Sequence, residues 1–117
     1  MDRKALLSIV AQRYGTEPEY PWPRWPSHAV LRHAGNRKWF GIVMNVPAKR
    51  LGLAGDVMVD IMNVKASPED VPALLLAEGI LPAYHMNKEH WVSVVLGGNL
   101  PDEMLLDLLE TSYRMTS

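Results

Sequence analysis

The pattern of apolar and polar positions predicts helices at both ends of the chain and strands between them. Apolar residues at helical spacing predict a first helix over residues 2–14. Its core-facing stripe consists of Leu6, Leu7, Val10 and Tyr14. Runs that alternate, or that are apolar at both parities, are typical of strands. The predicted strands cover residues 29–34, 37–46, 57–65, 80–86 and 91–96.

Turn and capping residues mark the boundaries of these elements. Gly35-Asn36 predicts a two-residue hairpin turn between the first two strands. Ser67-Pro68 is typical of a helix start, but Pro72 favours a later start at Asp70, and both alternatives stay open. The last helix is expected to begin near Leu100, after two glycines.

The resulting order is α-β-β-β-α-β-β-α within a single domain of residues 1–117. Strands joined by tight turns predict an antiparallel sheet, and amphipathic helices need a sheet face to cover. We therefore expect a two-layer α+β sandwich with the helices on one face. The opposite face would be only partly protected, which makes it the place for a partner.

Composition narrows the class of protein. Of 117 residues, 48% are hydrophobic and 21% charged, as in ordinary globular proteins, and there is no cysteine. This excludes disulfides and thiolate zinc sites and favours the cytoplasm. No apolar run approaches the ~20 residues that a membrane helix needs, and the first residues do not resemble a signal peptide. We expect a monomer that does not enter membranes.

The net charge of −1 hides an uneven distribution. Residues 1–59 carry nine Lys and Arg against four acids, whereas residues 60–117 carry three against nine. No acid occurs between Glu19 and Asp56. One face is therefore able to attract phosphates, although a solvated surface with balanced charges explains the same pattern.

A proline-rich segment, residues 16–28, interrupts the regular elements. Its four prolines between positions 18 and 26 rule out a helix or a central strand, so an extended, ordered loop is expected. Trp22, Arg24 and Trp25 form either a rim that stacks on a ligand or a cap over the core. The core-packing interpretation is favoured for Trp22, and less so for Trp25.

The stretch 81–96 concentrates polar side chains before a buried strand. Such a strand needs none of them to fold, so they mark the first candidate for function. The residues in question are Tyr84, His85, Asn87, Lys88, His90 and Trp91. Three interpretations stay open: contact with a polyanion, acid–base chemistry, or the locking of a turn.

The block from Pro82 to Val94 resembles the signature of the MmcQ/YjbR family. Its His-x-Asn-Lys-x-His-Trp core is the most specific part. Further landmarks in the expected order are Lys38-Trp39-Phe40, Val64-Lys65 followed by Ser67-Pro68-Glu69, and Ser112-Tyr113. The connection 47–56 is longer here than in many relatives. The resemblance implies a YjbR-like α+β fold, similar to type III secretion chaperones.

The resemblance also implies DNA binding. No helix-turn-helix or zinc finger is present, so contacts would come from strand ends and turns, with weak, salt-sensitive affinity. The candidate contact residues are Lys88, Asn87, Lys65, Arg37, Lys38, Lys49 and Arg50. The residues expected to shape the site are Tyr84, His85, His90, Trp91 and Trp25. We expect no cofactor, no metal and no catalytic residue.

Two alternatives remain beside DNA binding. The first is a small-ligand or catalytic pocket around His85, Lys88 and His90, in which the imidazoles act as acid and base. The second is a protein-binding module that uses the open sheet face, as the chaperone-like fold suggests.

Overall fold

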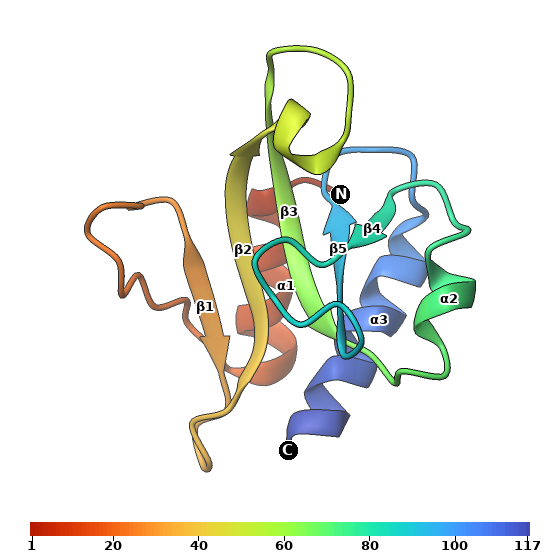
Figure 1. Ribbon diagram of the computed structural model, residues 1–117. Coiled ribbons are helices and arrows are strands. Elements are labelled where there is room, and N and C mark those ends of the chain that lie inside the picture. The colour runs from red at the N-terminus through yellow and green to blue at the C-terminus, as the bar shows by residue number, and fades with distance from the viewer.

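A computed structural model describes residues 1–117 and contains one five-stranded antiparallel sheet (Figure 1). The strand order across the sheet is β1-β2-β3-β5-β4. The strands are β1 Ala29–Arg32, β2 Trp39–Pro47, β3 Met58–Lys65, β4 Ile80–Pro82 and β5 Trp91–Val95. The helices are α1 Arg3–Tyr14, α2 Val71–Leu74 and α3 Asp102–Thr116, with a short 3-10 helix, η1, over Ala48–Leu51. The predicted element order and α+β class are confirmed.

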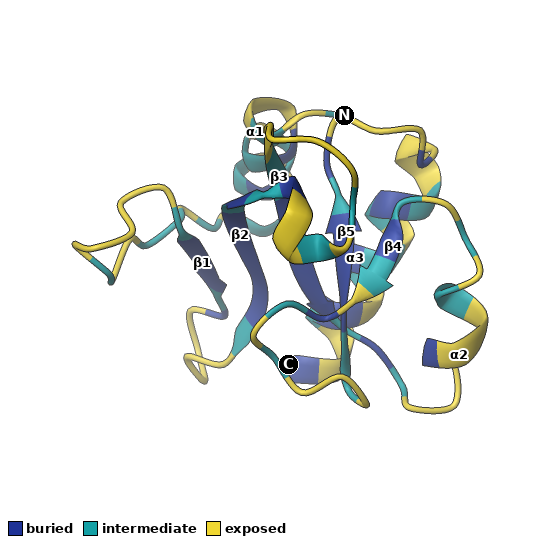
Figure 2. Ribbon diagram, turned by 45° about the horizontal axis from the view of Figure 1, so that its top comes forward, coloured by how far each residue is buried: buried dark blue, intermediate teal, exposed yellow.

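The helices lie on one face of the sheet, so the fold has two layers (Figure 1). Strand β2 serves both faces, because its side chains alternate from Ile42 onward and an irregularity in its pairing with β1 shifts the alternation at Phe40. Phe40 and Val43 belong to the core under the helices, whereas Ile42 and Met44 belong to a smaller cluster on the opposite face. Figure 2 shows the strands buried along most of their length and the surrounding loops exposed.

Helix α1 follows the prediction closely. The Asp2 carboxylate caps the helix by accepting a hydrogen bond from the Ala5 backbone N–H at 2.9 Å. Gly15 ends it in the left-handed conformation, with φ of 61°. Leu6 and Val10 of the predicted stripe are fully buried.

Helix α3 is tied to the sheet by a buried serine. The Ser112 hydroxyl donates to the Phe40 carbonyl at 2.6 Å and accepts from the Lys65 backbone N–H at 2.9 Å. One side chain thus satisfies backbone groups of β2 and β3 at the same end of the sheet.

Two local predictions need correction. The β1–β2 connection is a four-residue turn: the Arg37 N–H donates to the His33 carbonyl, and the His33 N–H donates to the Lys38 carbonyl. Arg37 has a left-handed backbone conformation, with φ of 64°. A two-residue turn at Gly35-Asn36 would not require this conformation at Arg37. The second helix begins after Asp70, as one alternative held. The sequence predicts that it continues to Gly79, but it ends at Leu74, because the following backbone hydrogen bonds are of the 3-10 type.

Candidate functional site

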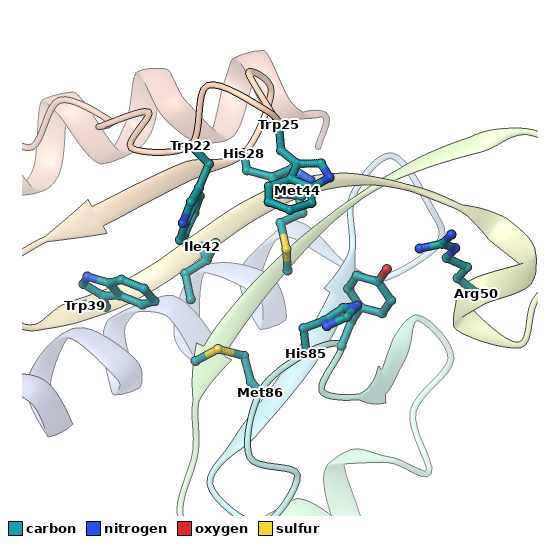
Figure 3. Close-up of a pocket in the computed structure, with 10 residues that line it drawn as sticks. Trp22, Trp25, His28, Trp39, Ile42, Met44, Arg50, His85 and Met86 are labelled. Atoms are coloured by element: carbon teal, nitrogen blue, oxygen red, sulfur yellow. The ribbon is translucent and has the colours of Figure 1, made fainter.

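A cleft of about 390 Å³ lies on the sheet face that the helices leave uncovered (Figure 3). Its floor comes from the alternate side chains Ile42 and Met44 of β2. The proline-rich loop and the loop between β4 and β5 form its walls. The ten lining residues are Trp22, Trp25, His28, Trp39, Ile42, Met44, Arg50, Tyr84, His85 and Met86.

Aromatic rings form the first wall. Trp22 meets Trp39 edge to face, with ring centroids 5.9 Å apart and an interplanar angle of 89°. Trp25 is stacked over His28 at 6.1 Å and 8°. Such pairs stabilise by about 0.5–1.5 kcal/mol beyond area burial, so they hold the loop in place without regular structure. Trp25 nevertheless stays 51% exposed.

Glu19 fastens the proline-rich loop to the sheet edge. Its backbone N–H and carbonyl pair with Val30 of β1 at 2.9 and 2.8 Å. Its carboxylate accepts from Arg32 at 3.2 Å and from Arg37 at 2.9 Å. Arg37, a predicted DNA contact, is therefore already paired with an acid inside the protein.

A buried polar network holds the second wall. The Asn63 amide donates to the Tyr84 carbonyl at 2.8 Å, and the Tyr84 N–H donates to the Ser93 hydroxyl at 2.9 Å. Ser93 in turn donates to the Asn63 side-chain oxygen at 2.5 Å. Asn63 and Ser93 are fully buried. Both backbone groups of Tyr84 are thus fixed from β3 and β5, and the next residue, His85, is left-handed, with φ of 56°.

The predicted contact residues of the β4–β5 loop are engaged within the loop itself. The Lys88 ammonium donates to the Ala83 carbonyl at 2.8 Å. The Asn87 side chain accepts from the Glu89 N–H at 2.8 Å, which is the geometry of a local Asx turn. Both contacts stay within the β4–β5 loop, which is the kind of contact that the turn-locking interpretation predicts.

The remaining predicted contact residues lie at two ends of the sheet. Lys65 and Lys38 lie at the end where β3 stops and β2 starts, together with Arg37. Lys49 and Arg50 follow the other end of β2, in η1. Nine residues at ~3.3 Å each separate the groups by roughly 30 Å. Of the seven contact candidates, only Arg50 lines the cleft.

Three of the residues expected to shape a site do line the cleft. These are Tyr84, His85 and Trp25, whereas His90 and Trp91 lie outside its lining. Sequence reasoning missed the floor of the cleft and the Asn63–Ser93 network. The apolar residues at both parities of β2 were a signal for the floor, since one parity had to serve the open face. Nothing local marks the network, because its partners are 30 residues apart.

The charged groups of the cleft lining all have the same sign or are neutral. The lining contains His28, Arg50 and His85, and no carboxylate. Burial lowers the pKa of His28 below its usual 6.5, and the positive charges of Arg3 and His85 lower it further. A hydrogen bond to the Asn45 carbonyl opposes this effect in part.

No cluster of three His, Asp or Glu side chains is placed to hold a metal ion. No helix combines the length and the apolar composition that a membrane span requires.

Fold and cleft together define a small α+β protein whose sheet carries an aromatic, ligand-sized cleft on its uncovered face. The chain belongs to the YjbR family, whose model matches residues 11–115. It is 44% identical to the uncharacterised protein YyaQ of Bacillus subtilis (strain 168), over 99% of this chain and 98% of that protein. It is 37% identical to the uncharacterised protein YbdF of Escherichia coli O157:H7, over 98% of this chain and 87% of that one.

Solved structures share the fold. A crystal structure of a protein from Pseudomonas syringae matches with a TM-score of 0.99 and 41% identity, covering 100% of both chains. A crystal structure of a Deinococcus radiodurans protein matches with a TM-score of 0.72 and 24% identity, covering 97% of this chain and 77% of that one. The second likeness concerns the fold alone.

Proposed function

We propose that this protein is a binding protein that holds a flat aromatic ring in the cleft. The observation that carries the proposal is the convergence of Trp22, Trp39 and Tyr84 around one open volume. These residues come from a loop, a strand and a second loop. The stability of a hydrophobic core does not require an open space between such rings. Aromatic rings bind flat ligands by stacking.

The size of the cleft supports a small ligand. Binding pockets for small molecules span about 300–1,000 Å³, and 390 Å³ lies near the lower limit. That volume suits one or two fused rings with a short substituent. Met44 and Met86 add flexible, polarisable side chains that adapt to the shape of an apolar guest.

The contacts of the histidine-rich loop favour binding over acid–base catalysis. His85 lines the cleft, but His90 does not, and Lys88 is hydrogen-bonded to the Ala83 carbonyl. The three residues that the sequence suggested as a catalytic set, His85, Lys88 and His90, therefore do not converge on the cleft.

The test uses the indole N–H signals of the four tryptophans in a proton–nitrogen NMR spectrum. Titration with the neutral ring compound 2-naphthylacetamide should shift the signals of Trp22, Trp25 and Trp39, which line the cleft. Trp91 lies outside the lining and serves as an internal reference. Trp25→Ala should weaken binding, whereas Tyr20→Ala, which removes an equally exposed ring of the same loop, should not. Uniform shifts, or none, would overturn the proposal.

A second candidate function is the binding of single-stranded DNA. It is favoured by the adjacent Lys49 and Arg50 beside an aromatic cleft, because stacking of unpaired bases on rings contributes ~1–3 kcal/mol per base. A base within a duplex cannot enter such a cleft without leaving its stack. The basic residues at the other end of β2 would then contact phosphates further along the strand.

Fluorescence anisotropy with single-stranded and duplex DNA tests this candidate. At ~50 mM salt, where phosphate contacts are strongest, single strands should bind more tightly than duplex, and affinity should fall as salt rises. Arg50→Gln should weaken binding. If neither form of DNA binds at ~50 mM salt, DNA is not the ligand.

A further inference from the structure

We infer that the ligand of the cleft is an aromatic anion, a ring that carries a carboxylate or phosphate group, and that Arg50 receives the charged group. This inference rests on the proposed binding of a ring in the cleft and adds the chemical class of the ligand. It depends on the distribution of charge and of aromatic rings along the cleft.

The two ends of the cleft differ in chemistry. Trp39 and Trp22 lie at one end, and Arg50 lies at the other (Figure 3). A ligand that fills the cleft therefore needs an apolar ring at its first end and a group compatible with a guanidinium at its second. Arginine presents several N–H donors in a planar fork that suits carboxylates and phosphates.

Arg50 has no acidic partner within the protein. The ion pairs of the chain join Glu19 with Arg32 and Arg37, Glu110 with Arg114, and Asp102 with the N-terminus. Arg50 takes part in none of them and in no side-chain hydrogen bond, and its side chain is exposed. Its guanidinium is thus available to a ligand without the loss of an internal contact.

Further nitrogen groups lie along and beside the cleft. The imidazoles of His28 and His85 line it, and two arginines lie outside the lining: the Arg24 guanidinium is 5.7 Å from the Trp25 ring centroid, and Arg3 donates to the Ser27 carbonyl. No carboxylate lines the cleft to balance them. Burial is the main reason that the pKa of His28 is lowered, and the charges of Arg3 and His85 lower it further; a bound anion would offset the part that comes from these charges.

The experiment compares two ligands of the same shape, the anion 2-naphthylacetate and the neutral 2-naphthylacetamide, by the same NMR titration at pH 6.5. The acetate should bind the wild-type protein about tenfold more tightly, as expected for a charge-assisted contact. Arg50→Gln should remove this preference by weakening the binding of the acetate more than that of the amide. Lys49→Gln is the matched control, because Lys49 is also exposed but does not line the cleft.

The outcomes separate the two proposals. If neither compound shifts the cleft tryptophans, the proposed ring binding itself fails. If both bind equally, ring binding stands and the inference about charge is overturned. If Lys49→Gln reduces the preference as much as Arg50→Gln does, the attraction is general and Arg50 is not the anion site. Loss of the preference in Arg50→Gln alone supports the inference.

Discussion

The Ser93 hydroxyl and the Asn63 side-chain oxygen lie 2.5 Å apart, and this buried hydrogen bond joins β5 to β3 beneath the candidate cleft. The pair does more than connect two strands that are already paired. Because Ser93 also accepts from the Tyr84 N–H and Asn63 donates to the Tyr84 carbonyl, the pair sets the position of one cleft wall.

Replacement of this serine should therefore destabilise the fold. Ser93→Ala leaves the half-buried Tyr84 N–H and the buried Asn63 oxygen without their partner, which costs about 1–3 kcal/mol in the free energy of unfolding. Urea unfolding measures the loss. Ser27→Ala, at an exposed position of the proline-rich loop, should change the free energy by less than about 0.5 kcal/mol. Equal stability of both variants would contradict the structural role of the network.

The backbone conformation at His85 predicts that glycine stabilises the fold more than alanine at this position, the reverse of the usual order. Its φ of 56° is unfavourable for any residue with a Cβ atom, so His85→Gly should be more stable than His85→Ala by about 1 kcal/mol. At His90, where φ is not positive, His90→Ala should be more stable than His90→Gly. Glycine loses more conformational freedom on folding than alanine does. Thermal unfolding of the four variants checks both orders. A more stable His85→Ala would show that the left-handed turn is not formed in solution.

The lowered pKa of His28 predicts pH-dependent binding of an anion. Its imidazole is neutral at pH 7, and a bound anion favours the protonated form and so raises the pKa. Affinity for 2-naphthylacetate should thus increase as the pH falls from 7.5 to 5.5, with proton uptake on binding. Titration calorimetry in buffers of different ionisation enthalpy measures this uptake.

His28→Gln should reduce both the proton uptake and the pH dependence. His90→Gln should leave both unchanged, because His90 lies outside the cleft lining. An affinity that is independent of pH would show that His28 does not sense the ligand.

Tyr14 should make the protein sensitive to alkaline pH. Burial and the hydrogen bond that its hydroxyl donates to Glu110 at 2.7 Å raise its pKa from 10 to about 12. A group whose pKa is raised on folding stabilises the fold below its unfolded pKa. This stabilisation is lost as the pH rises from about 10 to about 12. In Tyr14→Phe, which keeps the ring stacked on Tyr113, the loss of stability over this range should be smaller. Urea unfolding at pH 9, 10 and 11 compares the two proteins.

The element order could be predicted from the sequence because it depends on local signals. The helical spacing of Leu6 and Val10, the apolar run at both parities in β2, and the glycines at the ends of elements each act within a few residues. The exceptions were also local: the turn at Arg37 and the early end of α2 depend on backbone bonds that several turn sequences can form.

The distribution of the basic residues in space could not be predicted from the sequence. Between Arg24 and Arg50 the sequence has no acid, which suggested one basic surface. In the fold, β2 carries Arg37 and Arg50 to opposite ends of the sheet, and Glu19, from outside that stretch, neutralises Arg37. Proximity along the chain did not become proximity in space because an extended strand separates its ends.

The stretch 81–96 was found from the sequence as a family signature and a candidate site, because polar side chains before a buried strand stand out by composition. Only the tertiary structure assigned roles within it. In the folded protein Lys88 donates to the Ala83 carbonyl of its own loop. His85 and Tyr84 line the same cleft as tryptophans that lie some 60 residues earlier in the chain. A cleft between two loops arises from packing between distant segments, and no periodicity in the sequence records which segments will meet.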